Sequence, residues 1–176
     1  MNPKRNRAVI LDRDGTIIKQ VDGQYVTKPE QIEILPGAAK VIHEINKAGW
    51  LVAVATNQQC VAKGICKNED VELVHEALVK ALLLSNAKID LFVWCPHFSD
   101  ADCYCRKPRP GLLYRIAAAA RADLRECLMI GDAETDMLAA RAANCQYFGV
   151  KKNVGLAQWD PARLEKVRRV RVLERR

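Results

Sequence analysis

The chain has 176 residues, of which 49% are hydrophobic, and its formal net charge is +7. That length and composition fit one globular domain over residues 1–176 and leave little room for a second. No apolar run approaches the roughly 20 residues that cross a bilayer, and the N-terminal segment lacks the apolar stretch of a secretion signal. We therefore expect a cytoplasmic protein with no membrane partner.

Much of the positive charge lies in the C-terminal segment EKVRRVRVLERR, which we interpret as a solvated basic tail. Aromatic residues make up only 6% of the chain and do not alternate with the arginines, which disfavours a platform for stacking bases. We therefore expect no nucleic-acid partner, and we expect the chain to act as a monomer.

Short apolar runs alternate along the chain with longer helical patterns. The runs 8–11, 50–56, 89–95, 127–132 and 145–150 are continuously apolar, as strands are when helices cover both faces of a sheet. Helices are expected over 37–49, 68–86, 110–122 and 134–144, with Gly49 ending the first and Asn68 capping the second. This rhythm predicts an α/β fold: a three-layer, Rossmann-like parallel sheet with right-handed crossovers.

The core of this fold is expected over about residues 8–150. Residues 19–36, 57–67 and 96–110 fall outside the rhythm, and long connections in a compact α/β domain are usually functional. The first would form a flap with a hairpin turn at Asp22-Gly23. In the segment after Val150, LEKVRRVRVL is consistent with a short helix and a last edge strand.

Polar residues follow the expected strands where each strand ends. They are Asp12, Asp14 and Thr16 after the first, Thr56, Asn57 and Gln58 after the second, Arg106 and Lys107 before the third helix, and Asp132 and Asp136 after the fourth strand. Carboxyl ends of parallel strands share one edge, so these residues are expected to converge. Carboxylates that close can coexist around Mg²⁺, and Lys107 beside them suits phosphoryl oxygens. The pattern predicts phosphoryl transfer through an aspartate nucleophile.

Each of these residues also has a simpler interpretation. The pair Asp12 and Asp14 is compatible with a polar turn, and Asp136 with a charge that favours a helix N-terminus. Arg106 and Lys107 are compatible with a solvated pair, and Thr56 and Asn57 with turn residues. The convergence of all these positions at one edge favours the functional interpretation.

Seven cysteines favour a metal site with unpaired thiols over a disulfide framework. Cys95, His97, Cys103 and Cys105 form a complete tetrahedral set for a structural Zn²⁺, whereas packed cysteines would be hard to bury beside the polar stretch between them. Among the remaining residues we expect no metal at Cys60 and Cys66, packed thiols at Cys127 and Cys145, and ordinary helical side chains at His43 and His75.

The motifs DRDGT, ATNQ, CRKP and IGDAETD, in this order and spacing, resemble the phosphatases of the haloacid dehalogenase-like superfamily. Within it, residues 8–150 are most similar to the D-glycero-D-manno-heptose-1,7-bisphosphate 7-phosphatases, whose relatives include histidinol-phosphate phosphatases. The resemblance implies a haloacid dehalogenase-like fold without a separate cap domain, a small phosphorylated sugar as substrate, catalytic Mg²⁺ and structural Zn²⁺.

The resemblance also implies residue roles. Asp12 would be the nucleophile and a Mg²⁺ ligand, with Asp132 and the backbone carbonyl of Asp14 as further ligands. Asp14 would be the general acid and base, and Thr56 and Lys107 would bind the phosphoryl group. Asn57, Gln58 and Arg106 would contact the substrate, and Asp136 would orient the site from behind. Gln59 and Cys60 depart from the serine and glycine that the family usually has there.

Three other functions remain open at this stage. Histidinol phosphate is an alternative substrate, because its phosphatases share the zinc loop and because this loop is short. A polynucleotide 3′-phosphatase is an alternative that the basic tail favours and the zinc loop disfavours. A non-enzymatic zinc-stapled binding module would leave the carboxylates without a role.

Overall fold

A five-stranded parallel sheet runs through the computed structural model, which describes residues 6–167. Its strands are β1 (Ala8–Leu11), β2 (Leu51–Asn57), β3 (Leu91–Cys95), β4 (Leu128–Gly131) and β5 (Gln146–Gly149), in the spatial order β3-β2-β1-β4-β5. The central strand β1 pairs with both neighbours, so that Ile10 lies beside Ala53 on one side and Met129 on the other. The predicted α/β fold is confirmed.

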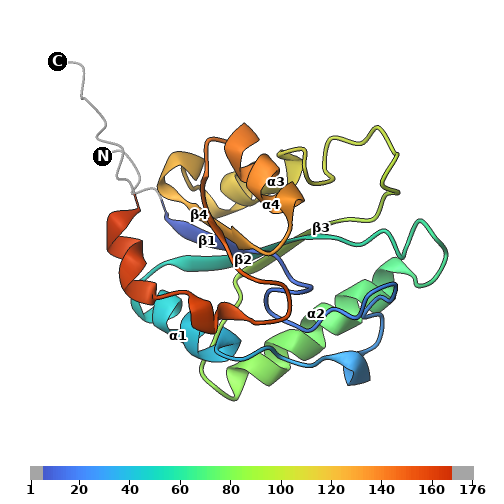
Figure 1. Ribbon diagram of the computed structural model, residues 1–176, viewed down its shortest axis with the longest axis horizontal. Helices are drawn as coiled ribbons and strands as arrows, with labels where there is room; N and C mark the ends of the chain where they lie inside the picture. The colour runs from blue at the N-terminus through green and yellow to red at the C-terminus, as the bar shows by residue number, and fades with distance from the viewer. Residues whose placement is uncertain (1–5, 168–176) are drawn as a thin grey trace.

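Helices cover both faces of the sheet (Figure 1). They are α1 (Ala38–Lys47) and α2 (Asn68–Leu83) on one face and α3 (Gly111–Ala120) and α4 (Glu134–Ala142) on the other. Successive residues of a strand point to opposite faces. Val9 and Leu11 therefore pack in the α1 and α2 layer, and Ile10 packs in the α3 and α4 layer. Two apolar cores result, one on each side of the sheet.

The ends of the helices follow local sequence signals. Gly49 has a φ of 77° and follows α1, as expected of a glycine that ends a helix. The predicted cap of α2 was wrong by one residue, since Lys67 is the N-cap and Asn68 the first helical residue. The Asp70 carboxylate accepts the backbone N–H of Lys67 at 2.8 Å, which is the contact that an acidic residue at the third helical position makes in a capping box.

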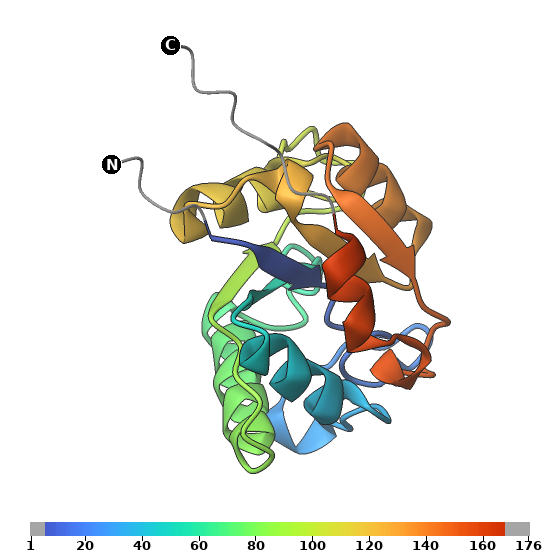
Figure 2. The same ribbon diagram turned by 90° about the vertical axis from the view of Figure 1, so that its left-hand side faces the viewer.

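The segment after β5 packs against α1 and extends the core beyond the expected range of about 8–150. Its 3-10 helices η3 (Leu156–Gln158) and η4 (Pro161–Lys166) lie beside α1 (Figure 2). Leu156, Trp159 and Leu164 are buried in the same core as α1 and α2. The expected short helix thus begins at Pro161, and most of the expected edge strand lies outside the described residues.

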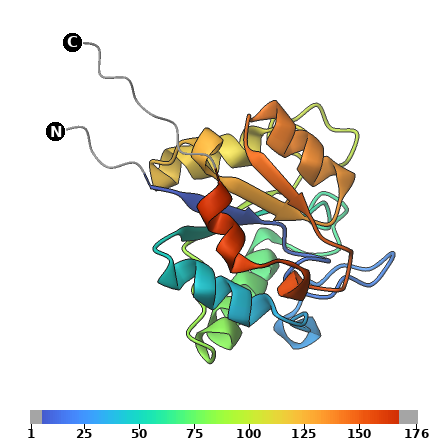
Figure 3. The same cartoon turned by 60° about the vertical axis from the view of Figure 1, so that its left-hand side comes forward.

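Three long loops gather at the carboxyl edge of the sheet (Figures 1 and 3). Residues 19–36 form the expected flap, in which Gln24 N–H donates to the carbonyl of Val21 across the Asp22-Gly23 turn at 3.0 Å. The flap carries the 3-10 helix η1 (Pro29–Gln31), and Asn153 holds its base through two hydrogen bonds to the Gln20 backbone, of 2.7 and 2.8 Å. A further 3-10 helix, η2 (Leu124–Glu126), precedes β4. Between residues 6 and 167, no helix has the length and apolar character needed to cross a membrane.

The close approach of α1 and η3 gives a test of this packing. Gly37 and Gly49 both have a φ of 77°, but a Cβ on Gly37 would lie 2.6 Å from the backbone nitrogen of Ala157, whereas a Cβ on Gly49 would meet nothing within 4 Å. We expect Gly49→Ala to lower the free energy of unfolding by about 1 kcal/mol through left-handed strain. Gly37→Ala should lose a further ~1–3 kcal/mol because two backbone segments must part. Urea unfolding measures both, and equal losses would contradict the close packing.

Candidate active site

The Lys107 ammonium is buried at the centre of the carboxyl edge. Its Nζ lies 2.8 Å from Asp12 Oδ1, 2.6 Å from Asp136 Oδ1 and 2.7 Å from the carbonyl oxygen of Ala55. An ammonium has three N–H donors, and these three acceptors use all of them. Burial lowers the pKa of Lys107, but the carboxylates of Asp12 and Asp136 outweigh it and raise the pKa above its ordinary value. Lys107 is therefore a fixed positive charge in the site.

Asp132 brings a third carboxylate to this cluster. Oxygens of Asp12, Asp132 and Asp136 lie within 4.8 Å of one another, and Thr16 Oγ1 donates to Asp132 Oδ1 at 2.8 Å. Gly15 has a φ of 86°, and a Cβ there would lie 2.6 Å from Asp132 Oδ2, so the turn after β1 admits only glycine beside this carboxylate.

The acidic cluster contains more negative than positive charge. The three carboxylates and the single ammonium of Lys107 leave two negative charges, which a divalent cation would balance. Burial raises the pKa of Asp12 to about 7, and burial also raises the pKa of Asp132. Both directions show that the ionised carboxylates are not fully compensated, so this donor set of oxygens fits a hard cation such as Mg²⁺.

Asp136 uses both of its oxygens within the protein. Oδ1 is paired with Lys107, and Oδ2 accepts the backbone N–H of Ala133 at 3.1 Å, at the start of α4. Its carboxylate thus fixes the ammonium and the helix terminus together, and this geometry agrees with the expected position behind the site.

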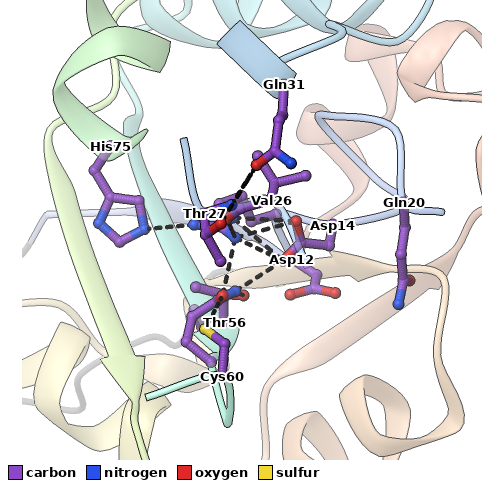
Figure 4. Close-up of polar contacts among 12 residues, drawn as sticks. Asp12, Asp14, Gln20, Val26, Thr27, Gln31, Thr56, Cys60 and His75 are labelled. Carbon is purple, nitrogen blue, oxygen red and sulfur yellow. Dashed lines mark hydrogen bonds and ion pairs between the residues drawn. The ribbon is translucent and has the colours of Figure 1, made fainter. Parts of the chain in front are cut away.

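Asp14 has partners other than Lys107, and Figure 4 draws the contacts of its carboxylate as dashed lines. Its carboxylate forms an ion pair with Arg13 at 3.0 Å and accepts Gln58 Nε2 at 2.7 Å. Its side chain is 20% exposed and lines the pocket, whereas Lys107 is 2% exposed. The two aspartates of the DRDGT motif therefore lie in unlike surroundings. Asp12 lies on a buried ammonium, whereas Asp14 lies at the edge of solvent and is paired with a buried guanidinium.

Gln58, which was predicted to contact the substrate, turns its side chain into the protein. Its side chain is buried, with Nε2 donating to Thr56 Oγ1 at 2.8 Å as well as to Asp14. Because the oxygen of Thr56 accepts this bond, its own hydroxyl hydrogen is available to a group in the pocket that Thr56 lines. Gln58 acts on the site through its neighbours.

Asn57 and Arg106 connect the site to the loop 96–110. The Asn57 side chain accepts the backbone N–H of Lys107 at 3.1 Å and donates to the Lys107 carbonyl at 3.0 Å, which fixes the backbone that carries the ammonium. Arg106 Nη1 donates to the carbonyl of His97 at 3.2 Å. Both residues line the pocket, as predicted for substrate contacts.

The four predicted zinc ligands lie together at the base of this loop. Their ligand atoms are within 4.8 Å of one another, with Cys95 Sγ 3.3 Å from Cys105 Sγ and 3.7 Å from Cys103 Sγ, and His97 Nδ1 3.2 Å from Cys105 Sγ. Two thiolates on a tetrahedral Zn²⁺ are about 3.8 Å apart, since each Zn–S bond is about 2.3 Å. The observed spacing and the donor set fit this ion.

A pocket of about 370 Å³ opens above the aspartates, between the flap and the loop 96–110. Its lining includes Asp12, Asp14, Lys19, Gln20, Tyr25, Thr56, Asn57, Gln59, Arg106 and Lys107. The volume suits a small molecule. The lining carries three cationic side chains, Lys19, Arg106 and Lys107, and three acidic ones, Asp12, Asp14 and Glu33.

Sequence reasoning missed several residues of this site. Arg13 is fully buried, and His75, expected to be an ordinary helical side chain, lies 3.2 Å from Arg13 Nη1 and stacks on Phe92. The flap residue Tyr25 accepts hydrogen bonds from Gln59 and Lys63, each of 2.9 Å. The sequence signalled only the contact between Gln59 and Tyr25, through the departure from the family pattern at Gln59. The expectation of packed thiols at Cys127 and Cys145 is confirmed, since both are buried and free.

Comparisons with known proteins agree with this geometry. A family model described as HAD-hydrolase-like matches residues 104–172. The chain is 39% identical over 148 residues to a D-glycero-beta-D-manno-heptose-1,7-bisphosphate 7-phosphatase of Pseudomonas aeruginosa, covering 84% of this chain and 83% of that protein. It is 36% identical over 143 residues to a D-glycero-alpha-D-manno-heptose-1,7-bisphosphate 7-phosphatase of Mycobacterium tuberculosis, covering 78% and 75% of the two chains.

Among solved structures, the fold is similar to that of D,D-heptose 1,7-bisphosphate phosphatase from B. bronchiseptica, crystallised with magnesium and phosphate. The TM-score is 0.79 at 31% sequence identity, and the match covers 92% of this chain and 84% of that one.

The buried His75 gives a prediction about stability and pH. Burial, and then the charge of Arg13, lower the pKa of His75 to about 3. An unfolded histidine titrates near 6.5. As the pH falls from about 6 to 4, the unfolded chain binds a proton that the folded chain does not, so this group lowers the free energy of unfolding by ~1.4 kcal/mol per pH unit.

Urea unfolding of the wild type and His75→Gln at several pH values measures this slope. We expect the variant to lose that component of the pH dependence, and His43→Gln, on α1, to retain it. A His75→Gln protein whose stability falls with pH as steeply as the wild type would contradict a neutral His75.

Proposed function

The chain belongs to the D-glycero-D-manno-heptose-1,7-bisphosphate 7-phosphatase family of haloacid dehalogenase-like hydrolases, and from this we propose that it removes the 7-phosphate of D-glycero-D-manno-heptose 1,7-bisphosphate. Membership makes it a phosphoric monoester hydrolase. The proposed mechanism rests on one observation. The two aspartates after β1 lie at one pocket but in unlike surroundings, Asp12 on Lys107 and Asp14 on Arg13. Two such carboxylates can take the separate roles of nucleophile and general acid.

Asp12 is the nucleophile in this proposal. Its carboxylate oxygen attacks the phosphorus of the 7-phosphate, and the bond from phosphorus to the sugar oxygen breaks as Asp14 gives that oxygen a proton. Asp14 then takes a proton from water, the water oxygen attacks phosphorus, and the bond to Asp12 breaks. Inorganic phosphate leaves, and both aspartates return to their starting states.

Lys107 and Thr56 bind the transferring phosphoryl group. The Lys107 charge is fixed beside the nucleophile, and the Thr56 hydroxyl hydrogen is free to donate because Gln58 occupies its oxygen. Asn57 and Arg106 contact the rest of the substrate from the pocket wall. Donors that are already oriented stabilise charge in the transition state without reorganising.

Magnesium is the proposed catalytic ion. Asp12, Asp132 and the backbone carbonyl of Asp14 would hold it, and it would neutralise phosphoryl oxygens next to the nucleophile. The charge balance of the acidic cluster supports this assignment, and the B. bronchiseptica relative was crystallised with magnesium and phosphate.

Zinc is proposed as a structural ion at Cys95, His97, Cys103 and Cys105. Four protein ligands leave no open position on a tetrahedral ion, so its role would be to order the loop. Cys105 directly precedes Arg106 and Lys107, and the loop therefore delivers both cations to the pocket.

All seven cysteines are free, which suits a reducing compartment. We propose that the enzyme acts in the cytoplasm as a single domain and a monomer.

Phosphate release tests the proposed reaction. With Mg²⁺, we expect the wild type to hydrolyse heptose 1,7-bisphosphate with a higher kcat/KM than histidinol phosphate or a 3′-phosphorylated oligonucleotide. Both anomers are assayed, because relatives of either anomeric name match the chain. Omission of Mg²⁺ from the assay should abolish release, and added Mg²⁺ should restore it.

Asp12→Asn should fold and bind zinc but release no phosphate, since an amide is not a nucleophile here. Normal turnover by this variant would contradict the proposed nucleophile, and a preference for histidinol phosphate would contradict the proposed substrate.

Zinc content tests the loop. We expect one Zn²⁺ per wild-type chain and loss of zinc in Cys103→Ser, with kcat/KM lowered by about 10- to 100-fold because Arg106 and Lys107 lose their fixed positions. Cys66→Ser, in the loop before α2, is the matched control and should retain zinc and activity. A zinc-free Cys103→Ser protein with wild-type kcat/KM would contradict the structural role.

A further inference from the structure

Arg13, between the two aspartates, is fully buried at the carboxyl end of β1. A buried guanidinium is costly unless every part of it has a partner. Its Nε lies 3.2 Å from Asp14 Oδ2, its Nη2 donates to Asp14 Oδ1 at 3.2 Å and to Gln58 Oε1 at 2.9 Å, and its Nη1 lies 3.2 Å from His75 Nε2. Nη2 also reaches the carbonyl of Val26 in the flap at 3.4 Å.

His75 completes this arrangement as an acceptor. It is buried on α2, and its ring stacks on Phe92 of β3 with a centroid separation of 4.3 Å and an interplanar angle of 17°. A guanidinium has no acceptor, so the contact with Nη1 requires an unprotonated Nε2 on the imidazole. The ring therefore accepts a hydrogen bond from Arg13 (Figure 4). Its plane is fixed by the stacking on Phe92.

Gln58 closes the arrangement on the other side. Its Oε1 accepts from Arg13, and its Nε2 donates to Asp14 Oδ2 and to Thr56 Oγ1. Only this orientation of the amide places a donor toward the carboxylate and an acceptor toward the guanidinium. Asp14 is thus bound from two directions by Arg13 and Gln58, and other hydrogen bonds fix the positions of both side chains.

We propose that Arg13 is a positioning residue, which with Gln58 and His75 fixes the Asp14 carboxylate in the orientation needed to protonate the leaving alcohol. This inference rests on the proposed function, in which Asp14 is the general acid. Arg13 touches neither the substrate nor the phosphorus in this account and acts only through the Asp14 carboxylate. The flap, the loop after β2 and helix α2 all contribute an acceptor to the same guanidinium, so the position of Asp14 depends on three segments distant in sequence.

Lysine cannot replace this arginine. The guanidinium presents five N–H donors in one plane, and its acceptors on Asp14, Gln58, His75 and Val26 lie in different directions around it. An ammonium has three donors on a flexible stem. Arg13→Lys therefore keeps the charge but leaves Asp14 less well oriented.

Leaving-group dependence separates this role from a general structural one. A sugar alkoxide needs a proton to leave, whereas the anion of 2,4-dinitrophenol does not, and kcat/KM reports the steps up to the first cleavage. In Arg13→Lys we expect kcat/KM for heptose 1,7-bisphosphate to fall about 100-fold, and that for 2,4-dinitrophenyl phosphate to fall less than about threefold. Asp14→Asn sets the scale for complete loss of the acid.

Arg7→Lys is the matched control, because Arg7 is an arginine at the opposite end of β1 that lies over the Trp50 ring at 3.8 Å. It should change kcat/KM for both substrates by the same small factor. An equal fall for both substrates in Arg13→Lys, or no fall, would overturn the positioning role. Wild-type protein that does not hydrolyse heptose 1,7-bisphosphate would instead contradict the proposed function.

A second variant covers failure of Arg13→Lys to fold. Gln58→Met keeps the volume of the side chain but removes the amide that donates to Asp14 at 2.7 Å. Its loss of the Thr56 contact should lower kcat/KM for both substrates alike, and the added misplacement of Asp14 should make the fall at least about tenfold larger for the heptose substrate. If the ratio of kcat/KM for the two substrates is the same in this variant as in the wild type, the inference is overturned here also.

Discussion

The buried ammonium of Lys107 is the interaction on which the arrangement of the site depends. Its three donors meet Asp12 from β1, the carbonyl of Ala55 from β2 and Asp136 from α4, so one charge joins three elements of the fold. Removing one member of such a buried group costs about 3–5 kcal/mol, because the remaining charges stay buried and unpaired. The same contacts fix the Asp12 carboxylate and leave the acidic cluster two negative charges in excess, which a divalent cation would balance.

Lys107 reaches this position only because a long loop brings it there. Asn57 binds both the N–H and the carbonyl of Lys107, and Arg106 is tied to the carbonyl of His97 beside the cysteine cluster. The group formed by Cys95, His97, Cys103 and Cys105, the Asn57 side chain and the ammonium thus form one series of contacts from the end of β3 to Asp12. Across the pocket, Arg13 does for Asp14 what Lys107 does for Asp12, and the two aspartates differ in environment because two different cations hold them.

Much of this was predictable from local sequence. Continuous apolar runs such as 8–11 and 127–132 identified buried parallel strands, and their shared carboxyl edge placed Asp12, Lys107 and Asp132 together. The sequence could not reveal Arg13 or His75 as partners, since an arginine after a strand and a histidine in a helix are ordinary until β1 and α2 are packed together. Nor could the sequence show that the Gln58 side chain, between neighbours that line the pocket, turns inward to bind Asp14. The packing of Leu156 and Trp159 depends on contacts with α1 that no local pattern encodes.

The central claim is that Asp12 carries the phosphoryl group during turnover. Wild-type enzyme mixed with heptose 1,7-bisphosphate and Mg²⁺, quenched with acid within one turnover and digested, is analysed by mass spectrometry for the peptide containing Asp12. We expect a phosphoryl group on Asp12 that disappears as inorganic phosphate accumulates. Release of phosphate within the first turnover with no phosphoryl group on Asp12, or with one on another residue, would contradict the account.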